Sequence, residues 1–186
     1  ASGTGVGVNA LLSRSLGEKN YDQVSKAAHN SILLSICSCI VFALIGIFGS
    51  RLFFASQTAD PQIREYGFQY MSIVCIFSFG VFLQFSMERL LQSTGRTFYT
   101  MITQGTGAII NIIFDPILIF GYFGFPEMGV AGAAAATVFG QIVAMFLGIY
   151  FNLRKNKDLK LSIKRLRFHM PTVKLIYIVG IPSILM

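Results

Sequence analysis

Long runs without a charged residue dominate this sequence and limit what it can fold into. Three of them hold no Lys, Arg, Asp or Glu, and a fourth, of 24 residues, holds a single acid, Asp115. The four runs are His29–Ser50, Tyr66–Met87, Tyr99–Tyr122 and Gly129–Phe151. Since about 20 mostly apolar residues cross a bilayer as a helix, the sequence predicts four complete membrane spans.

The composition agrees with a chain embedded in a membrane. Of the 186 residues, 54% are hydrophobic and only 12% are charged, whereas ordinary globular domains carry about 25% charged residues. Backbone groups in lipid must be hydrogen-bonded within helices or within a closed barrel. The runs lack the alternating segments of about 10 residues that form barrel strands. We therefore predict an all-α fold, a polytopic membrane helix bundle.

Two further uncharged segments lie at the ends of the chain and predict partial spans. They are Ala1–Leu12 and Leu175–Met186, and the first begins without Met. No basic stretch precedes Ala1–Leu12, as it would in a signal peptide. We therefore expect the chain to be an internal piece of a larger polytopic protein.

The basic residues are concentrated in alternate loops. The first set of loops, residues 13–28, 88–98 and 152–174, holds 13 of the 15 Lys and Arg residues. The second set, residues 51–65 and 123–128, holds only Arg51 and Arg64. Cytoplasmic loops carry the excess of Lys and Arg. The sequence thus predicts that the first set is cytoplasmic.

The densest basic run, Arg154–Arg167, lies between two apolar segments. A nucleic-acid patch is the alternative, but a run in this position is typical of a loop that sets membrane orientation. Leu159, Ile163 and Leu166 recur at helical spacing among the basic residues. This pattern predicts a short amphipathic helix on the anionic inner leaflet, and no nucleic-acid partner.

Motifs of soluble enzymes are absent from the sequence. It contains no GxSxG, HExxH or Walker motif. Cys37, Cys39 and Cys75 lie inside apolar runs, without CxxC spacing or a nearby His. We interpret them as small hydrophobic side chains rather than metal or redox groups. The sequence therefore predicts neither an enzyme nor a bound cofactor.

Small residues recur every fourth position near the start of the last complete span. Gly132, Ala136 and Gly140 share one helical face. Small residues at this spacing allow two membrane helices to approach closely. We expect this face to pack against a neighbouring helix.

Asp115 is the one acid within an otherwise uncharged run. A charge at the centre of a membrane helix costs about 2.5–3.5 kcal/mol on insertion scales, and such residues usually face a protein interior or a wet cavity and serve function. Asn111 lies four residues earlier and so shares the same helical face. Pro116 removes a backbone donor and frees a carbonyl about one turn back. The pattern predicts a functional polar site in this span.

Thr137, on the next span, is expected at a similar depth in the membrane to Asn111 and Asp115. With a rise of about 1.5 Å per residue, Asn111 lies near the centre, Asp115 roughly 7 Å further out, and Thr137 of the next span roughly 4–5 Å outward of centre. A carboxylate, an amide oxygen and a hydroxyl can bind a hard cation such as sodium, or they can form a proton site. The alternative is a hydrogen-bonded cluster that only joins two helices.

Glu88 is the second acid close to a span. It lies at the inner end of the run Tyr66–Met87 and is followed directly by Arg89. We expect an interfacial ion pair, or a side chain that reaches out to the membrane surface, rather than a transport site.

Four segments match one known family in order along the chain. They are Gly7–Glu18, Leu91–Thr97, Gly107–Tyr122 and Gly129–Gln141. The chain resembles the multidrug and toxic compound extrusion (MATE) family over nearly its whole length. The resemblance implies a transporter of twelve helices in two six-helix lobes. Residues 1–151 would then form amino-terminal lobe helices, from late in the second to the sixth, residues 152–174 the basic cytoplasmic loop between lobes, and residues 175–186 the start of the seventh helix.

The same resemblance implies a function. Members of the family are secondary antiporters that export organic cations or other toxic compounds in exchange for sodium or protons. By this resemblance, the Asn-xxx-Asp pair of the amino-lobe cation site in one branch falls on Asn111 and Asp115, and Thr137 of the following helix is carried over with it. A further acid of that site comes from the first helix and is missing here, as is the second lobe that shares the drug cavity.

Two other functions remain as alternatives. Related folds export lipid-linked precursors as flippases, and a structural membrane subunit would transport nothing. A flippase should present a cationic cavity to its anionic cargo. Here the intramembrane charge is a lone acid and the basic residues lie in loops, which favours coupling to a cation.

The uneven distribution of Lys and Arg also predicts which loops are accessible from each side. Single cysteines introduced at Asn156 and at Glu127 should react with an impermeant thiol reagent from opposite sides of the membrane. Reaction of both from one side would contradict the topology.

Overall fold

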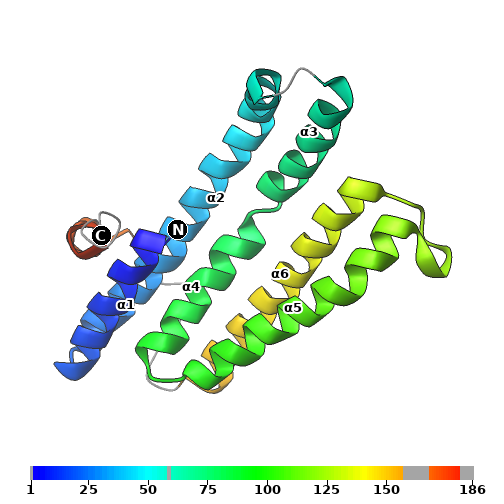
Figure 1. Ribbon diagram of the computed structural model, residues 1–186. Helices are drawn as coiled ribbons and strands as arrows, with labels where there is room; N and C mark the ends of the chain where they lie inside the picture. The colour runs from blue at the N-terminus through cyan, green and yellow to red at the C-terminus, as the bar shows by residue number, and fades with distance from the viewer. Residues whose placement is uncertain (1, 58–59, 157–167, 181–186) are drawn as a thin grey trace.

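The computed structural model describes residues 2–57, 60–156 and 168–180, and within these ranges every regular element is a helix. The helices are α1 (Ser2–Gly17), α2 (Tyr21–Gln57), α3 (Pro61–Ile76), α4 (Phe79–Ser93), α5 (Thr97–Phe120), the short 3₁₀ helix η1 (Tyr122–Gly124), α6 (Gly129–Arg154) and α7 (Met170–Gly180) (Figure 1). The prediction of an all-α bundle is confirmed.

Three of the described helices, α2, α5 and α6, are long and apolar enough to cross a membrane. The fourth span predicted from the sequence is divided: α3 and α4 meet at a bend of 47° and together make one broken span. The division falls at Phe77, which leaves the helical conformation, and at Ser78, whose amide bonds to the carbonyl of Cys75 only three residues back. The run of apolar residues gave no sign of this bend.

Local sequence sets several helix ends. The carboxylate of Asp60 accepts a hydrogen bond from the Gln62 backbone amide at 2.8 Å. Pro61 occupies the first turn of α3, where a backbone N–H has no acceptor within the helix, so its lack of an N–H costs no hydrogen bond. At the turn between α5 and α6, Gly121 ends α5 in the left-handed conformation at φ 71°. A side chain there would also collide with the backbone of Phe125 and Glu127.

The helices form an elongated layered bundle (Figure 1). Helix α6 packs against α5 on one side and against α3 and α4 on the other, and α2 packs against α3, α4 and α1. Helix α7 packs on α1. The largest apolar core lies where α1, α2, α4 and α7 meet. Its buried members are Val8, Leu11, Leu12, Val24, Ala27, Ala28, Met87, Leu90 and Ile176.

The small-residue face of α6 packs directly onto the backbone of α5. A Cβ atom on Gly132 would fall onto the carbonyl group of Leu118, and one on Gly140 would lie 2.7 Å from the carbonyl oxygen of Gly107. Ala136, between the two glycines, is fully buried. The predicted packing role of this face is therefore confirmed.

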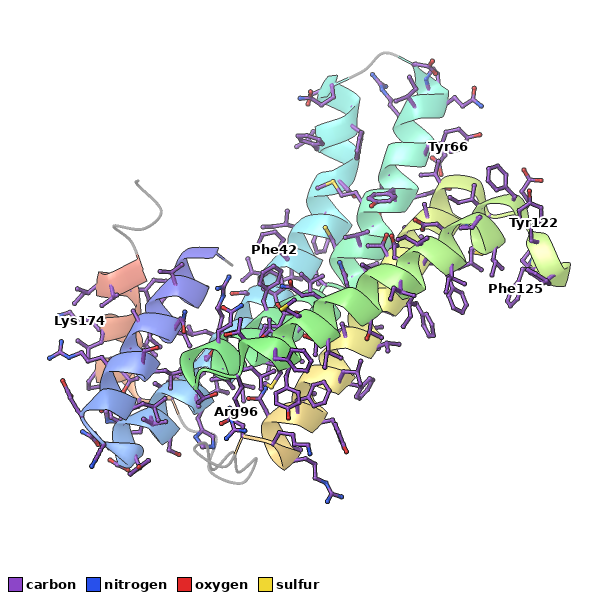
Figure 2. All side chains as sticks on the ribbon, turned by 60° about the horizontal axis from the view of Figure 1, so that its bottom comes forward. Phe42, Tyr66, Arg96, Tyr122, Phe125 and Lys174 are labelled. Carbon is purple, nitrogen blue, oxygen red and sulfur yellow. The ribbon has the colours of Figure 1, made fainter. Side chains whose placement is uncertain are left out.

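Large apolar side chains cover the outer faces of the long helices. Phe48 and Leu52 on α2 are 77% and 76% exposed, and Ile112 on α5 is 70% exposed. Such exposure suits lipid rather than water. Tyr122 and Phe125 lie at one end of the α5–α6 hairpin, and Arg96 lies at the opposite end (Figure 2).

At the start of the basic loop, Asn156 is buried, whereas the residue before it is exposed. Asn156 is 2% exposed and donates a hydrogen bond to the Thr94 hydroxyl at 3.0 Å, so a cysteine there would be inaccessible. Lys155 is exposed and is the better labelling position. The predicted surface helix at Leu159, Ile163 and Leu166 lies outside the described residues.

The α5–α6 contact predicts a contrast between two glycine substitutions. Gly132→Ala places a methyl group against the Leu118 backbone, so α6 must shift, and we expect a loss of about 1–3 kcal/mol of stability. Gly105→Ala on α5 meets no atom within 4 Å and should change stability by less than about 0.5 kcal/mol. Thermal unfolding followed by size-exclusion fluorescence compares the two. Equal melting temperatures would contradict the tight contact.

Candidate functional site

Asn111, Asp115 and Thr137 meet at the contact between α5 and α6. The Asn111 amide lies between the other two side chains, 3.2 Å from Asp115 Oδ2 and 3.1 Å from Thr137 Oγ1. The Thr137 hydroxyl lies 2.9 Å from the carbonyl oxygen of Ala133, one turn earlier on α6. The three side chains that the sequence placed at a similar depth are thus joined by hydrogen bonds, and the predicted contact between the two helices is confirmed.

The surroundings of the Asn111 amide fix its orientation. Its nitrogen faces the carboxylate and donates to Asp115 Oδ2 at 3.2 Å. Its oxygen faces α6 and accepts from the Thr137 hydroxyl at 3.1 Å and from the Thr137 backbone amide at 3.2 Å. Asn111 thus connects the acid to α6.

A cleft of about 280 Å³ opens beside this cluster. Its lining comes from three helices: Gln84 of α4, Gln104, Gly107, Ala108 and Asn111 of α5, and Thr137, Gly140 and Gln141 of α6. The spacing of Gln104, Ala108 and Asn111 puts them on one face of α5. Asp115 continues this face one turn further. The glycines at the helix contact therefore bring polar side chains of both helices to the cleft wall.

Glu88 differs from its sequence-based prediction. Its side chain does not reach the membrane surface: Glu88 is 2% exposed. Its Oε1 accepts a hydrogen bond from Gln84 Nε2 at 2.9 Å, and its Oε2 accepts one from Gln104 Nε2 at 2.9 Å. The expectation of an interfacial or ion-paired group is wrong, because α4 turns Glu88 toward α5 rather than toward the headgroups.

The neighbour of Glu88 takes a different direction. Arg89 donates to Gln92 Oε1 at 2.7 Å, and its side chain lies beside Gly5 of α1. Within the described ranges, the ion pairs join Arg14 to Glu18 and Lys26 to Asp22, so neither involves Glu88. Sequence reasoning missed this buried acid, although the four-residue spacing of Gln84 and Glu88 would have placed both on one helical face.

The cleft is suited to positive charge. None of its eight lining residues is basic, and two acids, Asp115 and Glu88, lie beside it. Amide oxygens, hydroxyls and carboxylates are the ligands that hard cations prefer. Among the described residues, no group of three or more His, Cys, Asp and Glu side chains could hold a metal ion. A transition-metal centre is therefore not indicated in that part of the chain.

Comparisons with known proteins identify the family of the chain. A family model described as MatE matches residues 1–117. The multidrug export protein MepA of Staphylococcus haemolyticus is 31% identical over 183 residues, which make up 98% of this chain and 39% of that protein. The FAD transporter of Shewanella oneidensis is 35% identical over 164 residues, or 86% of this chain and 35% of that protein.

A solved structure has the same fold. It is the inward-facing conformation of a multidrug resistance MATE family transporter of the MOP superfamily, and it superposes with a TM-score of 0.89 at 22% identity. The alignment covers 98% of this chain and 41% of that one. The chain thus spans about two-fifths of the length of the relatives it matches.

Fold and cleft together define a lobe of a multi-pass membrane transporter. The matching family model covers well over half of the chain, and the chain therefore belongs to the MatE family. Members of this family are transporters rather than enzymes. The resemblance inferred from the sequence motifs is confirmed.

Proposed function

We propose that this chain forms the amino-terminal lobe of a secondary antiporter that exports organic cations in exchange for sodium or protons. We assign residues 1–151 to the lobe, residues 152–174 to the connection with a second lobe and residues 175–186 to the start of the next helix. The described helix α7 already begins at Met170, within the last part of this connection. The observation that carries the proposal is the hydrogen-bonded cluster of Asn111, Asp115 and Thr137 beside the cleft.

Asp115 is the group on which the coupling ion acts. A carboxylate within a membrane span needs a counter-charge, because an uncompensated charge there is unfavourable, and the coupling ion supplies it. Asn111 and Thr137 supply neutral oxygens next to it. Asn111 also joins the acid to α6 through Thr137. An ion bound at Asp115 therefore acts directly at the contact between α5 and α6.

The orientation in the membrane follows from the loops. The 13 basic residues of loops 13–28, 88–98 and 152–174 place these segments in the cytoplasm. The α4–α5 turn at Arg96 then faces the cytoplasm, and the η1 turn faces outward. Asp115 lies in the outer half of α5, five residues before its end at Phe120. A coupling ion entering from outside thus reaches Asp115 before it reaches Glu88.

The substrate class follows from the charge of the cleft. A wall of amides and a hydroxyl, flanked by two acids and without a basic residue, supports a cationic substrate. The MepA relatives carry the name of multidrug export proteins, whereas the Shewanella relative is called an FAD transporter. An anionic dinucleotide or a lipid-linked anion would need basic groups that this cleft lacks. We therefore propose organic cations over both alternatives.

Replacement of Asp115 tests the coupling role in the full-length transporter. Asp115→Asn keeps the size and removes the charge, so we expect normal insertion but loss of efflux driven by an imposed sodium or proton gradient. Asn111→Ala removes one neutral ligand and should reduce coupled efflux less. Glu127→Gln, which removes an exposed acid outside the spans, is the control and should transport as the wild type does.

The measurement is uptake of a fluorescent cation into everted vesicles, with protein amount determined in parallel. Wild-type efflux by the Asp115→Asn protein would show that the acid has a structural role only. Coupled uptake of FAD, without uptake of the cation, would instead overturn the substrate class.

A further inference from the structure

Three glutamines line the cleft, one from each of its helices. They are Gln84 on α4, Gln104 on α5 and Gln141 on α6. A glutamine amide presents either two N–H donors or a carbonyl acceptor, and the two ends are on opposite sides of the group. Which end faces the cleft decides whether the wall attracts a cation or an anion. The surroundings of each amide settle this point.

Glu88 fixes two of the three amides. It lies behind the cleft wall, and each of its oxygens is 2.9 Å from a different amide nitrogen, that of Gln84 or that of Gln104. Both Glu88 oxygens act as acceptors in these bonds, so both amides turn their nitrogen atoms toward Glu88. The carbonyl oxygens of Gln84 and Gln104 are consequently turned away from Glu88.

Other groups around Glu88 reinforce this role. The Thr103 hydroxyl lies 3.5 Å from Oε1 but only 2.8 Å from the Thr100 carbonyl oxygen, which takes its hydrogen. The two amides are therefore the main partners of a carboxylate that is almost wholly buried. If one amide turned away, the buried carboxylate would keep an acceptor without a hydrogen bond, which is costly. This cost holds both glutamines in place.

The third glutamine differs from the other two. Gln141 lines the cleft, but its Oε1 is inaccessible to solvent and accepts no hydrogen bond from the described residues. Its acceptor therefore does not face the cleft, and the two amides beside Glu88 are the ones available to a ligand.

We infer that Glu88 is a positioning residue that makes this cleft selective for cations. Its carboxylate holds the amide nitrogens of Gln84 and Gln104, so that their oxygens recognise the charged head of a cationic substrate. The inference rests on the proposed export function and extends it. Asp115 handles the coupling ion, whereas Glu88 sets the substrate preference at a separate place on the wall, beside Gln104, which lies about three helical turns before Asp115 on α5.

A direct attraction between Glu88 and the substrate is the competing explanation, and the two differ in one respect. If Glu88 acts through the amides, the loss of affinity on replacing Glu88 becomes smaller once an amide is removed. If Glu88 attracts the substrate directly, the loss stays the same. A double-mutant cycle between positions 88 and 104 separates them. Gln104 is exposed and keeps Gln84 as a remaining partner of Glu88, so Gln104→Leu is a tolerable background.

The experiment measures the dissociation constant of ethidium for the full-length transporter in detergent, without any ion gradient. Glu88→Gln offers one acceptor oxygen and one donor group, so one of the two amides must reverse. We expect affinity to fall about tenfold in the wild-type background and only about threefold in the Gln104→Leu background. Gln62→Leu, an exposed glutamine on α3 away from the cleft, should not change the dissociation constant.

Three results would overturn the inference. They are an equal loss in both backgrounds, an unchanged affinity in Glu88→Gln, and a wild-type protein without saturable ethidium binding. If Glu88→Gln does not give a monodisperse protein, the Gln104→Leu variant alone decides. We then expect affinity for ethidium to fall about threefold in Gln104→Leu, and an unchanged affinity would contradict the inference. Because no gradient is present, failure of coupling through Asp115 leaves this measurement intact.

Discussion

The close contact between α5 and α6 is the constraint on which the rest of the site depends. Gly132 and Gly140 let the backbone of α6 lie against that of α5 at Leu118 and Gly107. At this separation a short amide side chain on one helix reaches a hydroxyl on the other, and Asn111 is 3.1 Å from Thr137. With larger residues at the contact, Asp115 would lose its connection to α6.

The bend between α3 and α4 contributes the opposite wall. Gly80, just after the bend, lies close to Ile142 of α6, and the face of α4 that follows carries Gln84 and Glu88 toward α5. The cleft thus has two acids with different surroundings. Asp115 contacts a single amide that also reaches Thr137, whereas Glu88 is enclosed by two amides. The first arrangement leaves oxygens for a cation; the second uses both carboxylate oxygens to orient the wall.

The sequence predicts much of this architecture because the membrane makes strong demands on it. Uncharged runs of sufficient length can form only spanning helices, and Asp115 stood out because a lone intramembrane acid is costly. The bend at Phe77 and Ser78 was not predictable, since no Pro or charge marks it. Glu88 was misjudged because its position near the end of a run says nothing about the direction in which its helix faces. That direction depends on packing against α5, which local sequence does not specify.

The central claim is that Asp115 binds the coupling ion, and infrared difference spectroscopy tests it most directly. Spectra of the full-length protein are recorded as sodium is added at constant pH and as pH is changed without sodium. The account predicts a carboxyl band, induced by one of the two ions, that is missing in Asp115→Asn and retained in Glu127→Gln. The same band in Asp115→Asn, at wild-type intensity, would contradict it.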